Sequence, residues 1–244
     1  MRLKCISCDA LARMVYLCAA QSPHQVDVSL LRLGLHRKPV DLQMRLQQEI
    51  DATTSLGYDA IVMAYGLCGR ATAGITARDV PVVIPRAHDC ITLFLGGRER
   101  YKQQHEQFPG TYWYALDYIE RGSQNGEKVV LGAAMDGFNI EEMFDEYVAK
   151  YGKENADYLM EVLGGWQNHY QRAAFIDVGV GNGAKVEDQA REEANKHGWA
   201  YERVVGDLIL VRRLLNADWQ DDFVVLQPGQ KLVMSYDEDI LRAE

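Results

Sequence analysis

The sequence has no run of apolar residues long enough to cross a membrane. A membrane-spanning helix needs about 20 such residues, and the apolar runs of this 244-residue chain are all much shorter. Arg2 and Lys4 precede a few apolar residues, as in a signal peptide, but Asp9 and Arg13 interrupt the segment that would have to be apolar. The sequence therefore predicts neither a membrane protein nor an exported one.

Cysteine is scarce, and basic residues are outnumbered. The chain has 5 cysteines, an odd number and too few for a disulfide scaffold at this length. We therefore expect reduced thiols and a cytoplasmic location. With 26 basic and 35 acidic residues the net charge is −9, and such a surface repels nucleic-acid phosphates on average. We also find no repeat and no linker rich in Pro, Gly or Ser.

Apolar segments alternate with helical periodicities along the chain. The segments 59–66 and 81–85 are apolar on both faces, which is typical of strands buried in a parallel sheet. Further strands are expected at 3–8, 26–33, 111–114, 173–178, 199–205 and 223–226. This alternation predicts an α/β fold, Rossmann-like, with one or more largely parallel sheets flanked by helices.

Helices are expected between these strands, each with its own start and stop signals. Asp9 and Asp41 stand at N-cap positions, Asn139 and Glu142 form a capping box, and a helix after Gly183 ends at Gly198. The apolar stripes of the predicted helices are Leu11, Met14, Val15 and Cys18; Leu42, Leu46 and Ile50; Met143, Tyr147 and Tyr151; Tyr158, Leu159 and Val162; Val186, Ala190 and Ala194; and part of 208–215. We expect one domain over 1–244, with possible lobes at 1–115 and 140–244.

Three cysteines are predicted to share one edge of the sheet. Cys5 lies near the end of the first predicted strand, and Cys68 and Cys90 follow the strands 59–66 and 81–85. The carboxyl ends of parallel strands meet at one edge, where ligands bind. His88 stands two residues before Cys90. Thiolate and imidazole ligands suit zinc or an iron–sulfur cluster, so we predict a metal site of Cys5, Cys68, His88 and Cys90.

Other roles for these residues remain open. His88 is alternatively an acid or base of catalysis, with Arg86 and Asp89 tuning the site. Each cysteine singly is as well explained by burial in the core, and Cys18 is expected there. The pair Cys5 and Cys8 has C-x-x-C spacing, but its place on the first strand does not favour thiol–disulfide exchange.

A glycine-rich turn offers a second candidate site. Gly179, Gly181 and Gly183 follow the strand 173–178 and precede a helix. Such turns let the backbone approach a nucleotide or S-adenosylmethionine. Glu202 is the candidate for the acidic residue expected about 20 positions on. A tight turn from strand to helix explains the glycines equally well.

Two further segments allow both a binding and a structural interpretation. The basic residues Arg98, Arg100 and Lys102 can anchor an anionic group of a small-molecule substrate, or can simply form the solvated start of a helix. The aromatic run 112–114 can line a pocket or pack within the sheet.

Several of these motifs together resemble a known family. They are Tyr65-Gly-Leu-Cys-Gly69, Pro85-Arg-Ala-His-Asp-Cys-Ile91, Leu95-Gly96 with the segment 98–101, and Pro109-Gly-Thr-Tyr-Trp113. The chain resembles an uncharacterised bacterial and archaeal family, a domain of unknown function, met in gene neighbourhoods of corrinoid-dependent methyltransferases. It departs from the family pattern at 116–118, where Leu-Asp-Tyr stands in place of a Gly-Trp pair.

The resemblance implies a context of one-carbon metabolism. It leads to three hypotheses: a metal- or cluster-bearing protein of corrinoid-linked methyl transfer, a non-catalytic accessory that delivers metal or cofactor to a corrinoid protein or methyltransferase, and an S-adenosylmethionine-dependent methyltransferase. Proteins that pass methyl groups from corrinoids to thiols hold zinc with a His-x-Cys pair and a distant Cys, and zinc there makes the thiol a nucleophile. His88, Cys90 and Cys68 are similar to that set in ligand type.

Overall fold

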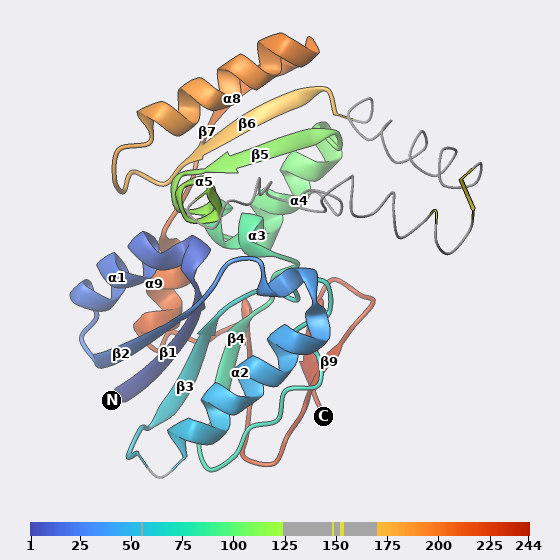
Figure 1. The fold of residues 1–244 in the computed structure, drawn as a ribbon. Coiled ribbons are helices and arrows are strands. Elements are labelled where there is room, and N and C mark those ends of the chain that lie inside the picture. The colour runs from blue at the N-terminus through green and yellow to red at the C-terminus, as the bar shows by residue number, and fades with distance from the viewer. Residues whose placement is uncertain (55, 124–147, 149–151, 154–169) are drawn as a thin grey trace.

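The computed structural model describes residues 1–54, 56–123, 148, 152–153 and 170–244. In these residues the chain forms two mostly parallel sheets, one above the other, with helices around and between them (Figure 1). The structure confirms the predicted α/β, Rossmann-like fold.

The first sheet holds the N-terminal strands and one strand from near the C-terminus. Its strand order is β2-β1-β3-β4-β8, and every pairing is parallel except that of β8 with β4. The strands are β1 (Arg2–Cys8), β2 (Gln25–Leu31), β3 (Ala60–Ala64), β4 (Val82–Pro85) and β8 (Phe223–Leu226). Every residue of β3 and β4 is buried, which explains why both segments are apolar on both faces.

The second sheet contains three parallel strands in the order β5-β6-β7. They are β5 (Thr111–Ala115), β6 (Arg172–Asp177) and β7 (Ala200–Val205), and a separate hairpin consists of β9 (Leu232–Met234) and β10 (Leu241–Ala243). The chain thus leaves the first sheet after β4 and returns to it with β8, so the two sheets do not divide the chain at a single point.

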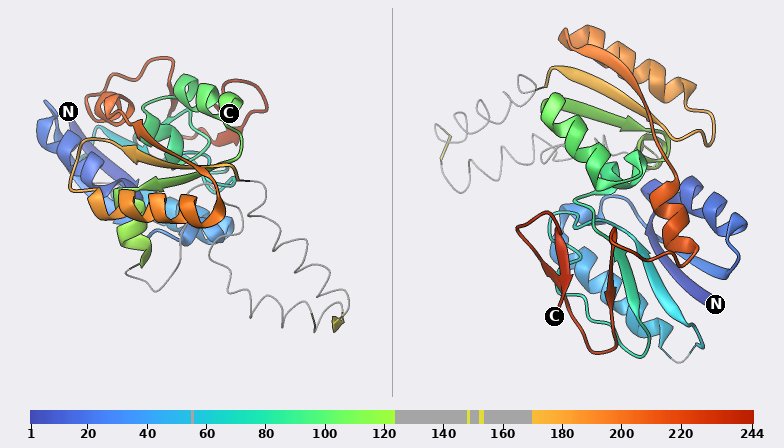
Figure 2. Two further views of the ribbon diagram at one scale, coloured as in Figure 1. Left: turned by 90° about the horizontal axis from the view of Figure 1, so that it is seen from above. Right: turned by 180° about the vertical axis from the view of Figure 1, so that it is seen from behind.

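Helices cover both faces of the first sheet. The helix α2 packs on one face with the apolar cluster that contains Leu42, while α1 and α9 pack on the other with the cluster that contains Met14. The helix α8 covers the outer face of the second sheet, and α3, α4 and α5 lie between the sheets (Figure 2). The helices are α1 (Ala12–Gln21), α2 (Pro39–Thr53), α3 (Cys90–Leu95), α4 (Arg98–Gln107), α5 (Leu116–Ser123), α8 (Ala184–His197) and α9 (Ile209–Leu215), with 3-10 turns η1 (Asp9–Leu11) and η2 (Leu35–Arg37).

The predicted helix ends are partly right. The helix α8 ends at Gly198, whose φ of 68° is in the left-handed region that glycine adopts without strain. Asp9 is not an N-cap, because it lies within η1 and its carboxylate accepts a hydrogen bond from Leu33 N at 2.6 Å. Asp41 lies in the first turn of α2, which begins at Pro39. The helices predicted after Asn139 and at 158–162 lie outside the described residues.

In the part of the chain that the structure describes, no helix combines the length and the apolar composition that crossing a membrane requires.

Candidate thiol site at the carboxyl edge of the first sheet

Three cysteines lie at the carboxyl ends of three neighbouring strands. Cys8 is the last residue of β1, Cys68 follows β3, and Cys90 follows β4 as the first residue of α3. Since β1, β3 and β4 are adjacent and parallel, their ends lie side by side. Cys8 contacts the apolar clusters on both faces of the sheet, while Cys68 packs against one of them and Cys90 against the other. The three cysteines therefore share one edge of the sheet, with Cys68 and Cys90 packed against opposite faces.

Cys5 is not at this edge, and the predicted placement was wrong. It pairs with Val28 and Val62 in the middle of β1 and is completely buried. It shares its apolar cluster with Cys18, which is also completely buried, as predicted for Cys18. The strand-end position that the sequence analysis gave to Cys5 belongs to Cys8.

The loops after β3 and β4 are joined by backbone hydrogen bonds. Leu67 N donates to Ala87 O at 2.8 Å, and Cys68 N donates to His88 O at 2.9 Å. A Cβ atom on Gly66 would lie 2.7 Å from Asp89 N, so only glycine permits this approach. Cys68 itself has a φ of 47°, in the left-handed region. The backbone thus fixes Cys68 beside the segment that carries Cys90.

The three thiols share one electrostatic environment. Burial raises the pKa of the Cys68 thiol to about 12, and the charge of Asp89 adds to the shift. Burial likewise raises the pKa values of Cys8 and Cys90, each of which is raised further by the charge of Cys68. All three thiols are therefore protonated at neutral pH in the absence of a bound cation.

Backbone N–H groups point at all three sulfur atoms. Cys8 accepts a hydrogen bond from the backbone of Ala10, Cys68 from that of Gly66, and Cys90 from its own N–H, and each bond lowers the pKa of its thiol. Hydrogen bonds of this kind stabilise thiolates and tune metal–thiolate centres.

Asp89 directly precedes Cys90, the first residue of α3, and acts as the N-cap of this helix. Its Oδ1 atom accepts hydrogen bonds from Ile91 N at 3.0 Å and Thr92 N at 3.3 Å. Burial raises the pKa of its carboxyl to about 6, against the effect of these two bonds. Its established contacts are thus those of a helix cap, and its charge raises the pKa of Cys68 and Cys90.

Tyr65 brings a buried hydroxyl to the same edge. Its side chain is 3% exposed, and its hydroxyl has no hydrogen-bond partner among the described residues. Burial raises the pKa of this phenol, and the charges of Cys8 and Cys68 raise it further. Buried hydroxyls in folded proteins nearly always have a partner, yet the Thr92 hydroxyl in α3 is also buried without one among the described residues.

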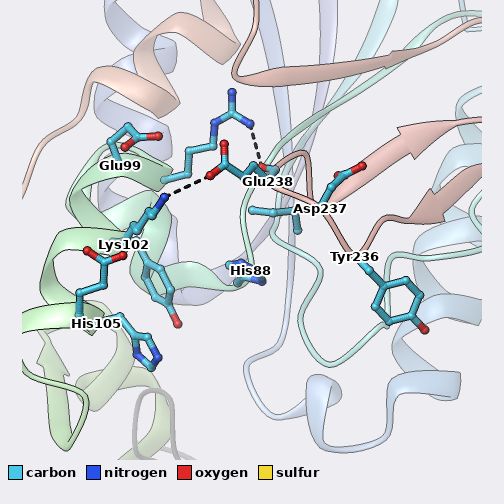
Figure 3. A pocket seen from close by; sticks show the side chains of 11 residues that line it. His88, Glu99, Lys102, His105, Tyr236, Asp237 and Glu238 are labelled. Carbon is cyan, nitrogen blue, oxygen red and sulfur yellow. Dashed lines mark hydrogen bonds and ion pairs between the residues drawn. The ribbon is translucent and has the colours of Figure 1, made fainter.

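His88 points into a neighbouring cavity of about 480 Å³ between α4 and the loop that connects β9 to β10 (Figure 3). Its ring lies 5.7 Å from that of Tyr101, which in turn stacks on His105. Burial lowers the pKa of His88, and the charge of His105 lowers it further. The predicted fourth metal ligand therefore lines a cavity beside the thiols.

The basic residues near this cavity bind the C-terminal loop. Lys102 Nζ lies 3.2 Å from Glu238 Oε1, and Arg98 donates to Glu238 O at 3.0 Å. Arg86, predicted to tune the site, donates to Asp239 O at 3.1 Å and so holds the base of the same loop. Arg100 donates to Leu95 O at 2.8 Å. The segment is thus the start of α4, as the alternative interpretation expects, but its basic side chains bind protein groups.

At the glycine-rich turn, two of the three glycines are needed for packing. A Cβ on Gly181 would lie 2.7 Å from Leu116, and one on Gly183 would lie 2.5 Å from Phe175. Asp177 beside the turn pairs with Arg203. Gly179, whose φ is 71°, has open space around it.

Glu202 does not lie at this turn. It pairs with Arg172 at the start of β6, whereas the turn follows Asp177 at its end. The backbone of Glu202 lies opposite Ala174, and its carboxylate is bound to Arg172 and so directed away from the turn. Glu202 is therefore not the acidic partner that the motif requires.

Cys8 and Tyr65 are the residues of this edge that sequence reasoning missed. Tyr65 belongs to the motif around Cys68, and Cys8 to the C-x-x-C pair with Cys5. Because β1 ends at Cys8, Cys8 and not Cys5 reaches the edge of the sheet.

The residue types at this edge are those that bind soft metals, but their side chains do not form a coordination sphere in the structure. In the described ranges, no three His, Cys, Asp or Glu side chains are grouped so that they could hold a metal ion. Three thiols with N–H donors directed at their sulfur atoms are nevertheless the donor set of zinc–thiolate and iron–sulfur centres. The thiols would have to draw together and lose their protons on binding.

A model of the family described as "Protein of unknown function (DUF1638)" matches residues 30–215. The matched range includes Cys68, His88, Cys90 and the glycine-rich turn, while Cys8 precedes it. No curated protein and no solved structure matches the chain.

Proposed function

We propose that this chain, which belongs to the DUF1638 family, uses Cys8, Cys68 and Cys90 to hold a zinc ion or an iron–sulfur cluster. The observation that carries the proposal is the placement of three cysteines at the ends of adjacent parallel strands, each thiol accepting a backbone N–H. A zinc ion with three protein ligands keeps a fourth position for a substrate or water, and it acts as a Lewis acid or activates the group bound there.

The cavity beside the thiols suits a substrate of this centre. His88 and Tyr101 line it, and burial raises the pKa of the Tyr101 phenol, which the charges of Asp89 and Cys90 raise further. His88 is neutral at pH 7 because its pKa is lowered, and in this form it can accept a proton from a small-molecule substrate.

The family resemblance gives the proposal its metabolic setting. We propose a cytoplasmic protein of one-carbon metabolism whose partner is a corrinoid protein or a corrinoid-dependent methyltransferase. The 5 cysteines are odd in number and too few for a disulfide scaffold, which favours a reducing compartment. A centre that activates a thiol or a methyl acceptor fits methyl transfer to or from a corrinoid.

The decisive test is the metal content of protein purified without oxygen. We expect about one zinc ion or one cluster per chain, lost in Cys8→Ser, Cys68→Ser and Cys90→Ser because each removes one thiolate. Cys5→Ala and Cys18→Ala are the matched controls, because both residues are buried core cysteines away from the edge. These controls should retain the metal and lose only stability.

Other outcomes lead to different functions. Iron with broad visible absorbance identifies a cluster and redox chemistry. A folded protein without metal contradicts the proposal and leaves the accessory role, in which the chain binds a corrinoid protein without turnover. Isolating a complex with that partner would then be the next measurement.

A further inference from the structure

The loop that connects β9 to β10 forms one wall of the His88 cavity, and α4 forms the other. Two cations on α4 bind one residue at the tip of the loop, Glu238. Lys102 Nζ lies 3.2 Å from Glu238 Oε1, and Arg98 donates to Glu238 O at 3.0 Å (Figure 3). Because both contacts run from one wall to the other, they limit how far the two sides of the cavity can separate.

In the described structure, polar contacts hold the tip of this loop. Residues 236–239 are all exposed, and the Tyr236 side chain is 89% exposed. Apolar burial resumes at Ile240, which is 4% exposed. Besides the contacts of Glu238, Arg86 donates to Asp239 O at 3.1 Å. Contacts between exposed charges are weak and are screened by salt, so the tip can exchange its partners for others.

Ile240, where the loop returns to the core, has a strained backbone. Its φ is 63°, in the left-handed region that a β-branched residue rarely adopts. Its carbonyl accepts a hydrogen bond from Ser235 N at 2.8 Å, and its N–H donates to Asp237 O at 3.2 Å, which closes the base of the loop. Strained residues of this kind occur at ligand clamps and switches. The strain favours a rearrangement of the loop once the contacts at its tip are lost.

The two cations belong to one face of α4. Four side chains that line the cavity follow the spacing of a helix face: Arg98, Tyr101, Lys102 and His105. Arg98 meets the loop through a carbonyl oxygen, while the nearest carboxylate oxygen of Asp239 is 3.6 Å away. Hydrogen bonds to charged acceptors are roughly twice as strong as those between neutral groups. A multiply charged anion therefore satisfies Arg98 and Lys102 better than the loop does.

We infer that Glu238 is a clasp that holds the cavity closed against α4, and that an anionic ligand opens it by taking over Arg98 and Lys102. The ligand is a small molecule with two or more negative charges. Glu99 and Glu106 also line the cavity and repel an anion that does not contact both cations. The clasp reduces the apparent affinity of the ligand, because only the open fraction of the protein binds it. It acts on the cavity alone and requires no metal ion at the strand ends, so the inference goes beyond the proposed function.

The first test is titration calorimetry with inorganic pyrophosphate, at constant ionic strength and without divalent cations. We expect Glu238→Gln to bind about two- to fivefold more tightly than wild type, because the competing carboxylate is gone. Lys102→Gln and Arg98→Gln should bind several-fold more weakly. The side chains of Lys102 and Glu238 are 54% and 90% exposed, so these variants should fold.

Lys196→Gln is the matched control, because it removes an exposed ion pair with Glu193 of 3.5 Å on α8. This variant should bind pyrophosphate like wild type. Equal affinities of wild type and Glu238→Gln, or no binding to either protein, would overturn the inference.

The second test follows hydrogen exchange in the loop, where the N–H groups of Ser235 and Ile240 report on its closed base. We expect faster exchange in Glu238→Gln than in wild type, and faster exchange in wild type with pyrophosphate than without it, because the tip is released. A ligand that bound beside an unmoved loop would leave exchange unchanged or slow it, and either result would contradict the clasp. Equal acceleration by chloride at the same ionic strength would show screening alone and would contradict it too.

Discussion

The two parallel sheets end in edges that look alike in sequence and differ in their contacts. At the edge of the second sheet, Asp177 pairs with Arg203, whose Nη1 atom lies 3.3 Å from Glu187, and the glycines pack against neighbouring side chains. At the edge of the first sheet, three half-buried thiols have no ionic partner, and the buried Tyr65 hydroxyl has no hydrogen-bond partner among the described residues. Buried groups that lack partners are those most in need of a ligand. The glycine-rich motif alone is therefore a weaker sign of a binding site than the unpaired groups are.

The largest expected effect concerns pH. Since Cys8, Cys68 and Cys90 all have raised pKa values, metal binding must displace up to three protons. We expect metal affinity to fall by up to about a thousandfold for each pH unit below neutral. Competition with a chelator at several pH values measures the slope. A slope near zero would mean that the thiols do not bind the metal.

Substitution of one glycine at each edge tests whether the two edges differ in metal binding. Gly66→Ala puts a methyl group against the backbone of Asp89 and Ala87, so the loops must move apart. Gly183→Ala puts one against the ring of Phe175. Each should cost about 1–3 kcal/mol of stability, measured by denaturant unfolding of metal-free protein. Only Gly66→Ala should also lose metal, and retention of metal in that variant would show that the loop contact does not shape the site.

Asp89→Asn tests how the charge of Asp89 affects the thiols at this edge. The amide oxygen still caps α3, while the charge that raises the pKa of Cys68 and Cys90 is gone. We expect both thiol pKa values to fall and alkylation of metal-free protein at a fixed pH to become several-fold faster. Asp89→Ala is the control for the cap, whose loss costs about 1 kcal/mol.

The same variant has a stability signature with a defined sign. The folded-state pKa of Asp89 is raised from 3.8 to about 6, so the protonated form favours folding. The stability from this group is fully present below pH 3.8 and is lost as the pH rises through about 6, by about 2–3 kcal/mol at most. Asp89→Asn should remove this dependence, and an unchanged unfolding profile between those pH values would contradict it.

The smallest effect is expected at the edge of the second sheet. Because Gly181 and Gly183 are explained by packing and Glu202, opposite Ala174 on β7, pairs with Arg172 at the start of β6, we expect no heat on titration with S-adenosylmethionine. Saturable heat that disappears in Arg203→Gln would instead establish a ligand site at this edge. The glycine-rich motif would then be a better sign of a binding site than the unpaired groups of the first sheet.

The fold was largely predictable from the sequence, because local signals agree with the tertiary structure. The strand β8 and the helix α8 with its end at Gly198 follow from apolar patterning and a glycine cap. The site was only partly predictable. The apolar strands before Cys68 and Cys90 predict their strand-end positions, but the last residue of β1 depends on its pairing with β2 and β3, so the sequence alone does not distinguish Cys8 from Cys5. The direction of His88 into the cavity depends on α4 and the β9–β10 loop, which are distant in sequence.

The two backbone hydrogen bonds between the loops after β3 and β4 also bear on how this protein changes over evolutionary time. Leu67 and Cys68 are bound to the backbone of Ala87 and His88, and Gly66 leaves room for Asp89. A substitution tolerated in one loop is thus restricted by the other, although the loops are about 20 residues apart. We expect the segments around Cys68 and Cys90 to vary together among related sequences and to be inherited as one unit, with Cys8 contributed by a separate part of the chain.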